Sequence, residues 1–545
     1  MSPTFLQKFK TILSDRKVTV FILLAVIVSR IIQLCYFYNI VVDASYQVIG
    51  TQSLLNGHGV SIPNVVATNL SAPIYTPLIN WPPGYSFLLA PFYALFKGDY
   101  IAAGITLDIL SSITLIFVCR SILKILDISL YIRNLFTILT GFFIYYFYFN
   151  PCSDAIAITF FLLALYFALA LIKSKKNQLL HTVLLTFFLF AVGTLKYLFI
   201  PAIFVIPVFL FFKALSDADK QLKKVALSSF LVIAVLLSTL LLYQKTVSGS
   251  ATYISAGGRG FFPENLLSTY PAIPASFIQP NTIHVLSASN EKTSVLFKVY
   301  QVINIVLLLL TVIVFCKQFI KHRFSNLTVL QSLFYLTFLL SFAVIGLLIV
   351  LSLVVEKEQI FSWRLWTYVE DGRYYGLPNV LIHLSLFAFY KYYTSVYKKN
   401  LRNLFYLFLL LLVPEMLRGI YFDINRIKSY KKEEYSWQFE KRFQDYADSI
   451  IQSEKKIIPD AKVVITGTSY YFNHRIIINS QAAPLNELAA INEFPLLNSK
   501  TPVILLTILQ KDSVANYQPF VSKKEVKQVG SFGDLNFFIT TVVPH

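Results

Sequence analysis

The sequence predicts a polytopic α-helical membrane protein with about eleven transmembrane helices and a small α/β domain at its C-terminal end. Composition is the first reason: 56% of the residues are hydrophobic and 14% are charged, whereas a typical soluble domain has about 25% charged residues. The second reason is a series of apolar runs close to 20 residues long, the length of helix that crosses a bilayer. The third is a change to mixed polar and strand-like sequence after about residue 420.

The chain begins with a basic segment, residues 1–17, that leads into the first apolar run at residues 18–38. This run lacks the small-residue cleavage site of a secretory signal, so we expect it to remain as a transmembrane helix. Further runs of suitable length are residues 100–122, 131–149, 154–172, 179–195, 197–212, 225–243, 299–320, 327–355, 375–393 and 401–420. We therefore assign residues 18–422 to a transmembrane domain with two long irregular loops, 39–99 and 244–298.

The basic residues predict the orientation, because Lys and Arg favour the cytoplasmic side of short loops. With a cytoplasmic N-terminus every second loop should be basic, and these loops are, at Arg120, Lys173, Lys213, Lys317 and Lys398 with their neighbours. Both long loops and the C-terminal tail then lie on the outer face of a plasma (inner) membrane. The net charge of +19 reflects this topology, and we do not expect nucleic-acid binding.

The C-terminal region, residues 423–545, predicts a small extracytoplasmic α/β domain. Residues 423–457 read as an amphipathic helix with an apolar stripe. Its stripe consists of Tyr435, Phe439, Phe443, Tyr446 and Ile450. Strand-like runs follow at residues 461–467, 474–480, 501–509 and 536–543, with a helix-like segment at 484–494. From its position, we expect this domain to take part in selecting an acceptor.

Charged groups beside the outer helix ends are the candidate site residues, because charges at membrane depth are costly and most often functional. They are Asp43, Asp154, Lys196 and Arg373, the last followed by Tyr374. The first loop adds Tyr46, His58, Trp81 and Tyr85 on the same face. Lys and Arg can neutralise a phosphate, and an ionised carboxylate can accept a proton from a hydroxyl. Such a set suits transfer from a lipid-linked phosphate.

Each of these residues also has a purely structural interpretation. Asp43 and Asp154 lie at helix ends, where acids often cap the helix. Lys196 could extend along the helix to reach the interface, and Arg373 could pair with Asp371 on the surface. The four cysteines are far apart and include no C-x-x-C pair, so they indicate neither a disulfide framework nor a zinc site.

The candidates belong to an ordered set of short motifs between residues 15 and 420. The motifs are VVDASY with Asp43, TQSLLNGHGVSIP, NWPPGYSFLLAPFYALFKG, SDAIAITFFLLAL with Asp154, LKYLFIP with Lys196, and DGRYYGLP with Arg373. This order resembles the membrane glycosyltransferases of the C-type superfamily, which use polyprenyl-phosphate-linked sugars. It is most similar to the branch that holds the protein O-mannosyltransferases and aminoarabinose transferases.

The resemblance implies a role for each residue. Asp43 would be the general base of an inverting transfer, and Asp154 would orient the acceptor or the sugar. Lys196 and Arg373 would hold the donor phosphate. Substrate contacts would also come from the aromatic and imidazole side chains: Tyr46, His58, Tyr85 and Tyr374.

Two departures from the family pattern stand out. Trp81 precedes the Pro-Pro pair, where many relatives have a basic residue or His. Asp43 starts an Asp-Ala-Ser sequence, which is neither the Asp-Glu pair of the protein mannosyltransferases nor the D-x-D of the metal-using oligosaccharyltransferases. Protein mannosyl transfer is therefore less favoured, and we expect neither a divalent metal nor another cofactor.

The sequence thus predicts an enzyme that transfers a hexosyl-type or pentosyl-type sugar from a polyprenyl-phosphate donor to an envelope acceptor, which could be a glycan, a lipid or a protein. The alternative class is a transporter or lipid flippase for a cell-envelope precursor. Transporters often contain internal repeats with interrupted helices, and neither is evident in the sequence.

Overall fold

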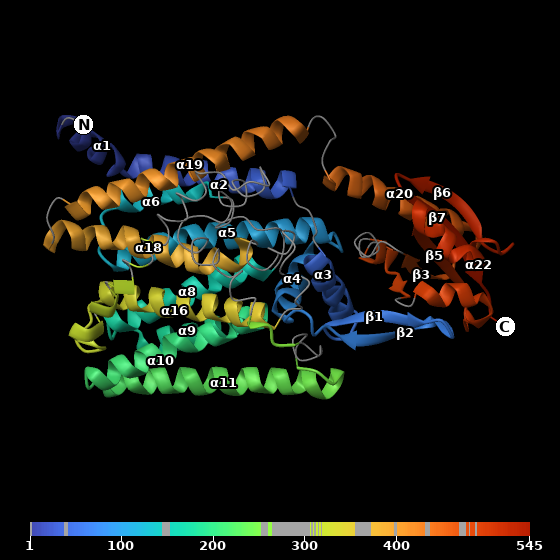
Figure 1. Ribbon diagram of the computed structural model, residues 1–545, viewed down its shortest axis with the longest axis horizontal. Coiled ribbons are helices and arrows are strands. Elements are labelled where there is room, and N and C mark those ends of the chain that lie inside the picture. The colour runs from blue at the N-terminus through green and yellow to red at the C-terminus, as the bar shows by residue number, and fades with distance from the viewer. Residues whose placement is uncertain are drawn as a thin grey trace.

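The computed structural model describes residues 3–37, 42–143, 153–251, 260–263, 319–354, 372–396, 400–430, 436–467, 476–478, 480–485 and 488–544, with scattered positions between 306 and 317. In this part of the chain, long helices lie side by side in one bundle, and a sheet domain stands beyond one end of it (Figure 1). The N-terminus lies at the opposite end of the bundle. We call these two ends the domain end and the far end.

The helices of the bundle are α1 (Pro3–Leu13), α2 (Arg16–Phe37), α5 (Tyr100–Ile125), α6 (Leu130–Gly141), α8 (Ser153–Lys173), α9 (Gln178–Leu195), η1 (Tyr197–Phe199), α10 (Ile200–Ser216), α11 (Lys220–Ser248), α16 (Val329–Leu353), α18 (Gly372–Val396) and α19 (Asn400–Tyr430). Seven spans in the described residues, in α2, α5, α8, α9, η1 with α10, α11 and α16, are long and apolar enough to cross a membrane. The other predicted runs coincide with α6, α18, α19 and helical positions between 306 and 320. The prediction of a multi-pass membrane protein is confirmed.

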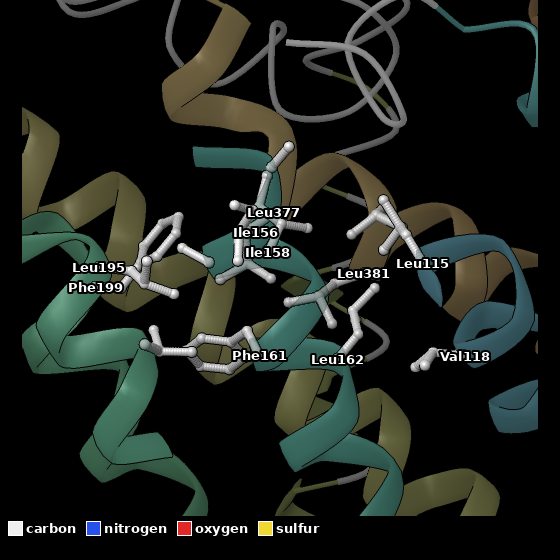
Figure 2. Close-up of a cluster of buried hydrophobic side chains, with 14 of the residues drawn as sticks. Leu115, Val118, Ile156, Ile158, Phe161, Leu162, Leu195, Phe199, Leu377 and Leu381 are labelled. Carbon is white, nitrogen blue, oxygen red and sulfur yellow. The ribbon is translucent and has the colours of Figure 1, made fainter. Parts of the chain in front are cut away.

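Helix α8 lies at the centre of the bundle. Its sequence is apolar on all sides, which is typical of a helix surrounded by other helices, and α5, α9, α10, α16 and α18 pack against it. Figure 2 shows Ile156 and Phe161 of α8 among buried side chains that include Phe199 of η1 and Leu377 of α18. The core thus brings three segments together at the domain end of the bundle.

The first loop, residues 42–96, is a compact unit and not the irregular segment predicted. It consists of α3 (Val42–Leu55), the antiparallel strands β1 (Ser61–Val66) and β2 (Asn69–Pro77), and α4 (Gly84–Leu95). Gly57 and Gly59 connect α3 to β1 with φ angles of +84° and +67°, a conformation that glycine adopts without strain. The Pro and Gly residues therefore separate short regular elements, which is why the stretch looked irregular in sequence.

The C-terminal domain contains α20 (Ser436–Ile457), β3 (Lys462–Gly467), β4 (Ala483–Pro484), η4 (Leu488–Leu496), β5 (Val503–Gln510), η5 (Lys511–Tyr517), α22 (Gln518–Val521), β6 (Lys527–Phe532) and β7 (Leu535–Val542). The sheet order is β4-β3-β5-β7-β6. Strand β3 is parallel to β4 and β5, and β7 is antiparallel to β5 and β6. The prediction of a small α/β domain is confirmed.

Both faces of this sheet are covered. On one face, Phe443 of α20 is fully buried and packs 5.5 Å from Phe537, ring centre to ring centre. On the other face, Phe520 of α22 and Ile491 of η4 pack with Phe538. Because it has no solvent face, β5 is a continuous apolar run that is buried along its length up to Gln510.

Three details of this region differ from the prediction. Residues 423–430 of the predicted amphipathic helix 423–457 are the last turns of α19, and α20 begins at Ser436. The run at residues 474–480 was expected to be a strand, yet residues 476–478 and 480, the described ones, are helical. A short apolar run does not distinguish a strand from a buried helix. Strand β6 was not predicted, because it is partly exposed and carried no apolar signal in the sequence. The helix-like segment at 484–494 is confirmed from Leu488 onward, as the 3-10 helix η4.

The hairpin of the first loop joins the C-terminal domain. Val65 of β1 forms a parallel bridge with Leu485, next to β4. The Leu70 amide donates to the Asn498 carbonyl, and the Asn498 amide donates to the Ala67 carbonyl, both at 2.9 Å. Val65, Ala67 and Leu70 are part of the hydrophobic core on one face of the sheet. The first loop and the C-terminal domain are therefore one packed unit.

Candidate active site

An ion pair lies at the domain end of the bundle, between Asp154 and Lys196. The Lys196 ammonium nitrogen is 2.6 Å from Oδ1 of Asp154, and the two side chains are 12% and 2% exposed. Asp154 is the second residue of α8. An ion pair this deeply buried loses more hydration than a surface pair. Two residues chosen from separate sequence motifs are thus brought into direct contact.

Lys196 occupies a break between two helices. Its backbone is extended, with φ −148° and ψ 112°, between α9 and η1. Pro201 lies in the first turn of α10, where its missing amide hydrogen costs nothing. The hydroxyl of Tyr197, the next residue, accepts a hydrogen bond of 2.8 Å from the side-chain amide of Gln244, near the end of α11. The break therefore holds the Lys196 side chain beside the start of α8.

Four helices of the bundle begin at this end: α5, α8, the η1–α10 segment and α18. Leu377, one turn into α18, lies beside Ile156, which is in the first turn of α8 (Figure 2). Helix N-termini present unpaired amide hydrogens and a partial positive charge. A helix N-terminus beside a lysine is a favourable position for an anion.

The WPPG motif of the first loop packs directly against this site. A Cβ atom on Gly84 would lie 2.5 Å from the carbonyl oxygen of Thr194 and 2.6 Å from its Oγ1. Only glycine fits this approach between α4 and the last turn of α9, two residues before Lys196. Tyr85, the next residue, is fully buried. Close packing against Thr194 therefore explains the glycine of this motif, and this contact could not be predicted from the sequence.

Tyr46 connects the start of α3 to the same motif. Its ring stacks on Trp81 with centres 4.8 Å apart. Asp43 is the second residue of α3 and precedes Tyr46 by three positions, which places the two on one face of the helix. The WPPG motif thus contacts Tyr46 of α3 at Trp81 and Thr194 of α9 at Gly84.

The side chains of Asp43, Arg373 and Tyr374 lie outside the described part of the structure, which gives only their backbone positions. Arg373 and Tyr374 are the second and third residues of α18. Arg373 precedes Leu377 by four positions and shares its face of the helix. Both candidate residues of α18 thus begin a helix that packs against α8.

His58 lies apart from these residues. It follows the C-terminal end of α3, whereas Asp43 and Tyr46 lie at the N-terminal end. The His58 ring is exposed and stacks on Tyr75 of β2 with centres 3.6 Å apart. The structure therefore separates His58 from the Lys196 region and positions it near the C-terminal domain.

Sequence reasoning missed a buried polar network between α2 and α19. Arg30 is fully buried and donates to the carbonyl oxygen of Phe143 at 3.1 Å. Asp423 of α19 accepts hydrogen bonds from Ser29, at 2.5 Å, and from Gln33. The signal was available, because a lone Arg inside an apolar run is unusual. This network attaches the first transmembrane helix to the helix that leads to the C-terminal domain.

A second missed residue is Asp108 of α5, which is 3% exposed. Within the described residues its carboxylate oxygens have no hydrogen-bond partner. One turn away, Ser111 shares a hydrogen bond of 3.0 Å with Thr159 of α8. This acid was also visible in the sequence as a single charge within an apolar run.

The far end of the bundle has a different kind of ion pair. Lys173, at the end of α8, lies 2.9 Å from Asp127, with side chains 37% and 67% exposed. Lys175 lies 3.3 Å from Asp219. Three of the loops predicted to be basic and cytoplasmic therefore meet at one end, opposite the Asp154–Lys196 pair.

The fold and this site define a multi-pass membrane protein with a candidate anion site at one end of its helices. No protein-family model matches the sequence, and no curated protein is similar to it in sequence. Among solved structures, ArnT from Cupriavidus metallidurans bound to undecaprenyl phosphate is similar over 96% of this chain and 97% of its own, with 14% identity and a TM-score of 0.47.

The oligosaccharyltransferase of Archaeoglobus fulgidus in its apo form is similar over 92% of this chain and 71% of its own, with 13% identity and a TM-score of 0.49. AglB from the same organism, in complex with an inhibitory peptide and a dolichol-phosphate, is similar over 92% and 70%, with 12% identity and a TM-score of 0.44. Identities of 12–14% do not define a function.

Proposed function

We propose that this protein is a glycosyltransferase that moves a sugar from a polyprenyl-phosphate donor to an acceptor on the outer face of the plasma membrane, with inversion at the anomeric carbon and without a metal. The observation that carries the proposal is the buried Asp154–Lys196 pair at the starts of α8 and η1. A cation held in this way is ready to receive a phosphate at the depth where a lipid-linked donor presents it.

Asp154 has a specific role in this proposal. It holds the Lys196 ammonium before the donor arrives and supplies the counter-charge that makes burial of Lys196 tolerable. When the phosphate enters, its negative charge is attracted by the same ammonium and by the positive ends of the helix dipoles. Arg373, at the start of α18, adds a guanidinium that can hold a phosphate through two hydrogen bonds.

Asp43 completes the reaction as the general base. Its carboxylate accepts the proton of the acceptor hydroxyl while the hydroxyl oxygen bonds to the anomeric carbon from the face opposite the phosphate. The bond between the anomeric carbon and the phosphate oxygen breaks, and polyprenyl phosphate leaves with the electron pair. Lys196 and Arg373 stabilise the negative charge on this leaving group.

The aromatic residues of the first loop bind the sugar in this proposal. Tyr46, stacked on Trp81, lies one turn from Asp43. Tyr85 is buried beside Gly84, which contacts Thr194. Trp81 replaces the basic residue that many relatives have, so the donor phosphate depends more strongly on Lys196 and Arg373.

The proposal is tested by measuring transfer from a panel of radiolabelled polyprenyl-phosphate sugars into total membrane acceptors. We expect transfer by the wild type and a loss of roughly 100-fold or more in Asp43→Asn, since removal of a general base typically costs 10²–10⁴-fold. Asp99→Asn is the matched control. Asp99 caps α5 through the amides of Ile101 and Ala102, and Asn caps a helix equally well.

Equal transfer by wild type and Asp43→Asn would remove Asp43 from the mechanism. Absence of transfer with every donor, together with movement of a fluorescent polyprenyl phosphate across proteoliposome membranes, would contradict the enzyme and support the flippase alternative.

A further inference from the structure

A second candidate binding site lies where the first loop meets the C-terminal domain. It is a cavity of about 120 Å³. Its walls come from the end of α3, the β1–β2 hairpin, α4 and the segment that precedes β4. The cavity is larger than a single water molecule needs, and it lies at the opposite end of α3 from Asp43.

In the described part of the chain, the side chains that line this cavity are uncharged and suit a neutral polar ligand. Tyr75 and Tyr93 provide aromatic rings, and Gln52, Asn56 and Gln481 provide amides that both donate and accept hydrogen bonds. The face of an aromatic ring is negatively polarised and attracts the partly positive C–H groups of a sugar ring. Rings and amides in one small cavity thus match the two kinds of surface that a saccharide presents.

The polar lining is fixed in place before a ligand binds. The side-chain amide of Gln52 donates to the hydroxyl of Tyr93 at 2.7 Å and to the carbonyl oxygen of Ile478 at 2.9 Å. The ring of Tyr75 is stacked on His58. Pre-ordered groups lose less conformational freedom on binding, which favours affinity. This arrangement gives His58 a function as a positioning residue for Tyr75.

We propose that this cavity binds a neutral saccharide unit of the acceptor, several sugar units away from the hydroxyl that reacts. This proposal rests on the proposed function, because it makes the ligand the acceptor of the transfer. It assigns the acceptor to the oligosaccharides, either free or attached to a lipid, and it gives the C-terminal domain a direct role in choosing it.

Geometry supports an extended acceptor. Gln52 and Asn56 follow Asp43 by nine and thirteen residues, and a helix rises 1.5 Å per residue, so they lie about 14 Å and about 20 Å farther along the helix axis. One sugar residue cannot span that distance. A chain of several sugars can place its reactive hydroxyl at Asp43 and a distal unit beside Tyr75.

Two other classes of ligand fit less well. A peptide commonly binds by adding a strand to an open sheet edge, but the bridge between Val65 and Leu485 already occupies the edge beside β4. An acidic glycan or a phosphorylated lipid headgroup needs cations, and among the described residues the lining side chains carry no charge.

The experiment uses the purified full-length chain in lipid nanodiscs and an array of neutral and acidic oligosaccharides of two to six sugars, with a peptide array in parallel. We expect binding to neutral oligosaccharides and a loss of about tenfold or more in Tyr75→Ala, equivalent to about 1.4 kcal/mol. Tyr75→Phe should retain binding, since it keeps the ring. Asn56→Trp fills the cavity without removing a ring, and it should also abolish binding.

Ile74→Ala is the matched control. Ile74 precedes Tyr75 on β2, is 55% exposed and does not line the cavity, so binding should equal that of the wild type. The best oligosaccharide is then compared in free and lipid-linked form. Binding of both forms supports a soluble or polymeric acceptor, and binding of the lipid-linked form alone supports a membrane-borne one.

Failure of this proposal is distinguishable from failure of the proposed function. Lys196→Met should lose donor-dependent transfer and keep oligosaccharide binding. Measurable transfer without binding of any neutral oligosaccharide overturns the saccharide site and leaves the transferase intact. Binding confined to peptides or acidic glycans, or binding that Tyr75→Ala and Asn56→Trp leave unchanged, also overturns it.

Discussion

The two ends of helix α8 each have an ion pair, and the pairs differ in burial. Asp154 and Lys196 at the domain end are 2% and 12% exposed, whereas Lys173 and Asp127 at the far end are 37% and 67% exposed. The atoms involved and the distances are nearly the same. The two pairs therefore differ in their access to water: water can replace the partner in the exposed pair far more easily than in the buried one.

This difference has a physical reason. A surface pair exchanges one set of water contacts for a weak Coulomb attraction, and its net contribution is about 0–1 kcal/mol. A buried pair loses hydration on both ions, and a hydrophobic pair of similar volume would often be as stable or more stable. The pair at the domain end is thus poor as a stabilising device, and the proposed anion-binding function gives a reason for its presence.

Lys196→Met should have the largest effect among the variants that test this comparison. It removes the ammonium that pairs with the buried Asp154 carboxylate and should destabilise the protein by about 3–5 kcal/mol. The double variant Lys196→Met with Asp154→Leu should recover most of that stability and remain inactive. Thermal unfolding in detergent and sugar transfer measure the two effects. A double variant that stays as unstable as the single one would mean that the pair is structural.

Gly84→Ala tests whether the first loop supports Lys196. The added methyl group would meet the Thr194 carbonyl at 2.5 Å, and the resulting shift should cost about 1–3 kcal/mol and lower transfer. Gly346→Ala in α16 is the control, because a Cβ atom there meets nothing within 4 Å. It should leave transfer unchanged. Identical behaviour of the two variants would contradict the close packing of α4 on α9.

Asp219→Ala tests the residue that caps α11 at the far end. Asp219 accepts hydrogen bonds from the amides of Gln221 and Leu222, each at 3.0 Å. The Leu222 amide lowers the pKa of the Asp219 carboxyl, and Lys175 adds to the effect. Loss of the cap should cost about 1 kcal/mol at neutral pH.

The pH dependence of this effect follows from the direction of the pKa shift. The folded-state pKa is below the unfolded value of about 3.9, so the stabilisation is fully present above that value and is lost as pH falls through the folded-state pKa. The stability difference between wild type and Asp219→Ala should therefore be constant at higher pH and shrink below about pH 3.9. A difference that grows on acidification would contradict this account.

Lys173→Met should have the smallest effect. Its pair with Asp127 is exposed, so unfolding in detergent should change by less than about 1 kcal/mol and transfer should be unchanged. The same substitution at Lys196 is the contrasting variant. If Lys173→Met were as damaging as Lys196→Met, burial would not explain the difference between the two ends.

Parts of the site could be predicted from sequence because their signal is local. Asp154 and Lys196 were recognisable as charges at the ends of apolar runs, and Arg30 and Asp108 carried the same signal inside such runs. The contact between Asp154 and Lys196 could not be predicted, since it depends on how α8 and α9 pack. The roles assigned to Asp43 and Arg373 remain predictions.

The sequence by itself determined the helical spans. A bilayer requires long apolar segments whose backbone groups are hydrogen-bonded within the segment, and such segments are visible as continuous apolar runs. It also determined the amphipathic helix α20, though not its start, because residues 423–430 of the predicted helix belong to α19. The buried strand β5 was recognisable as an apolar run.

The tertiary structure alone decided that the β1–β2 hairpin joins the C-terminal sheet. It also decided that Gly84 approaches Thr194, and that Tyr75 and Gln481 share a cavity. These contacts join residues far apart in the chain through shape and backbone hydrogen bonding, and neither property leaves a periodic signal in sequence.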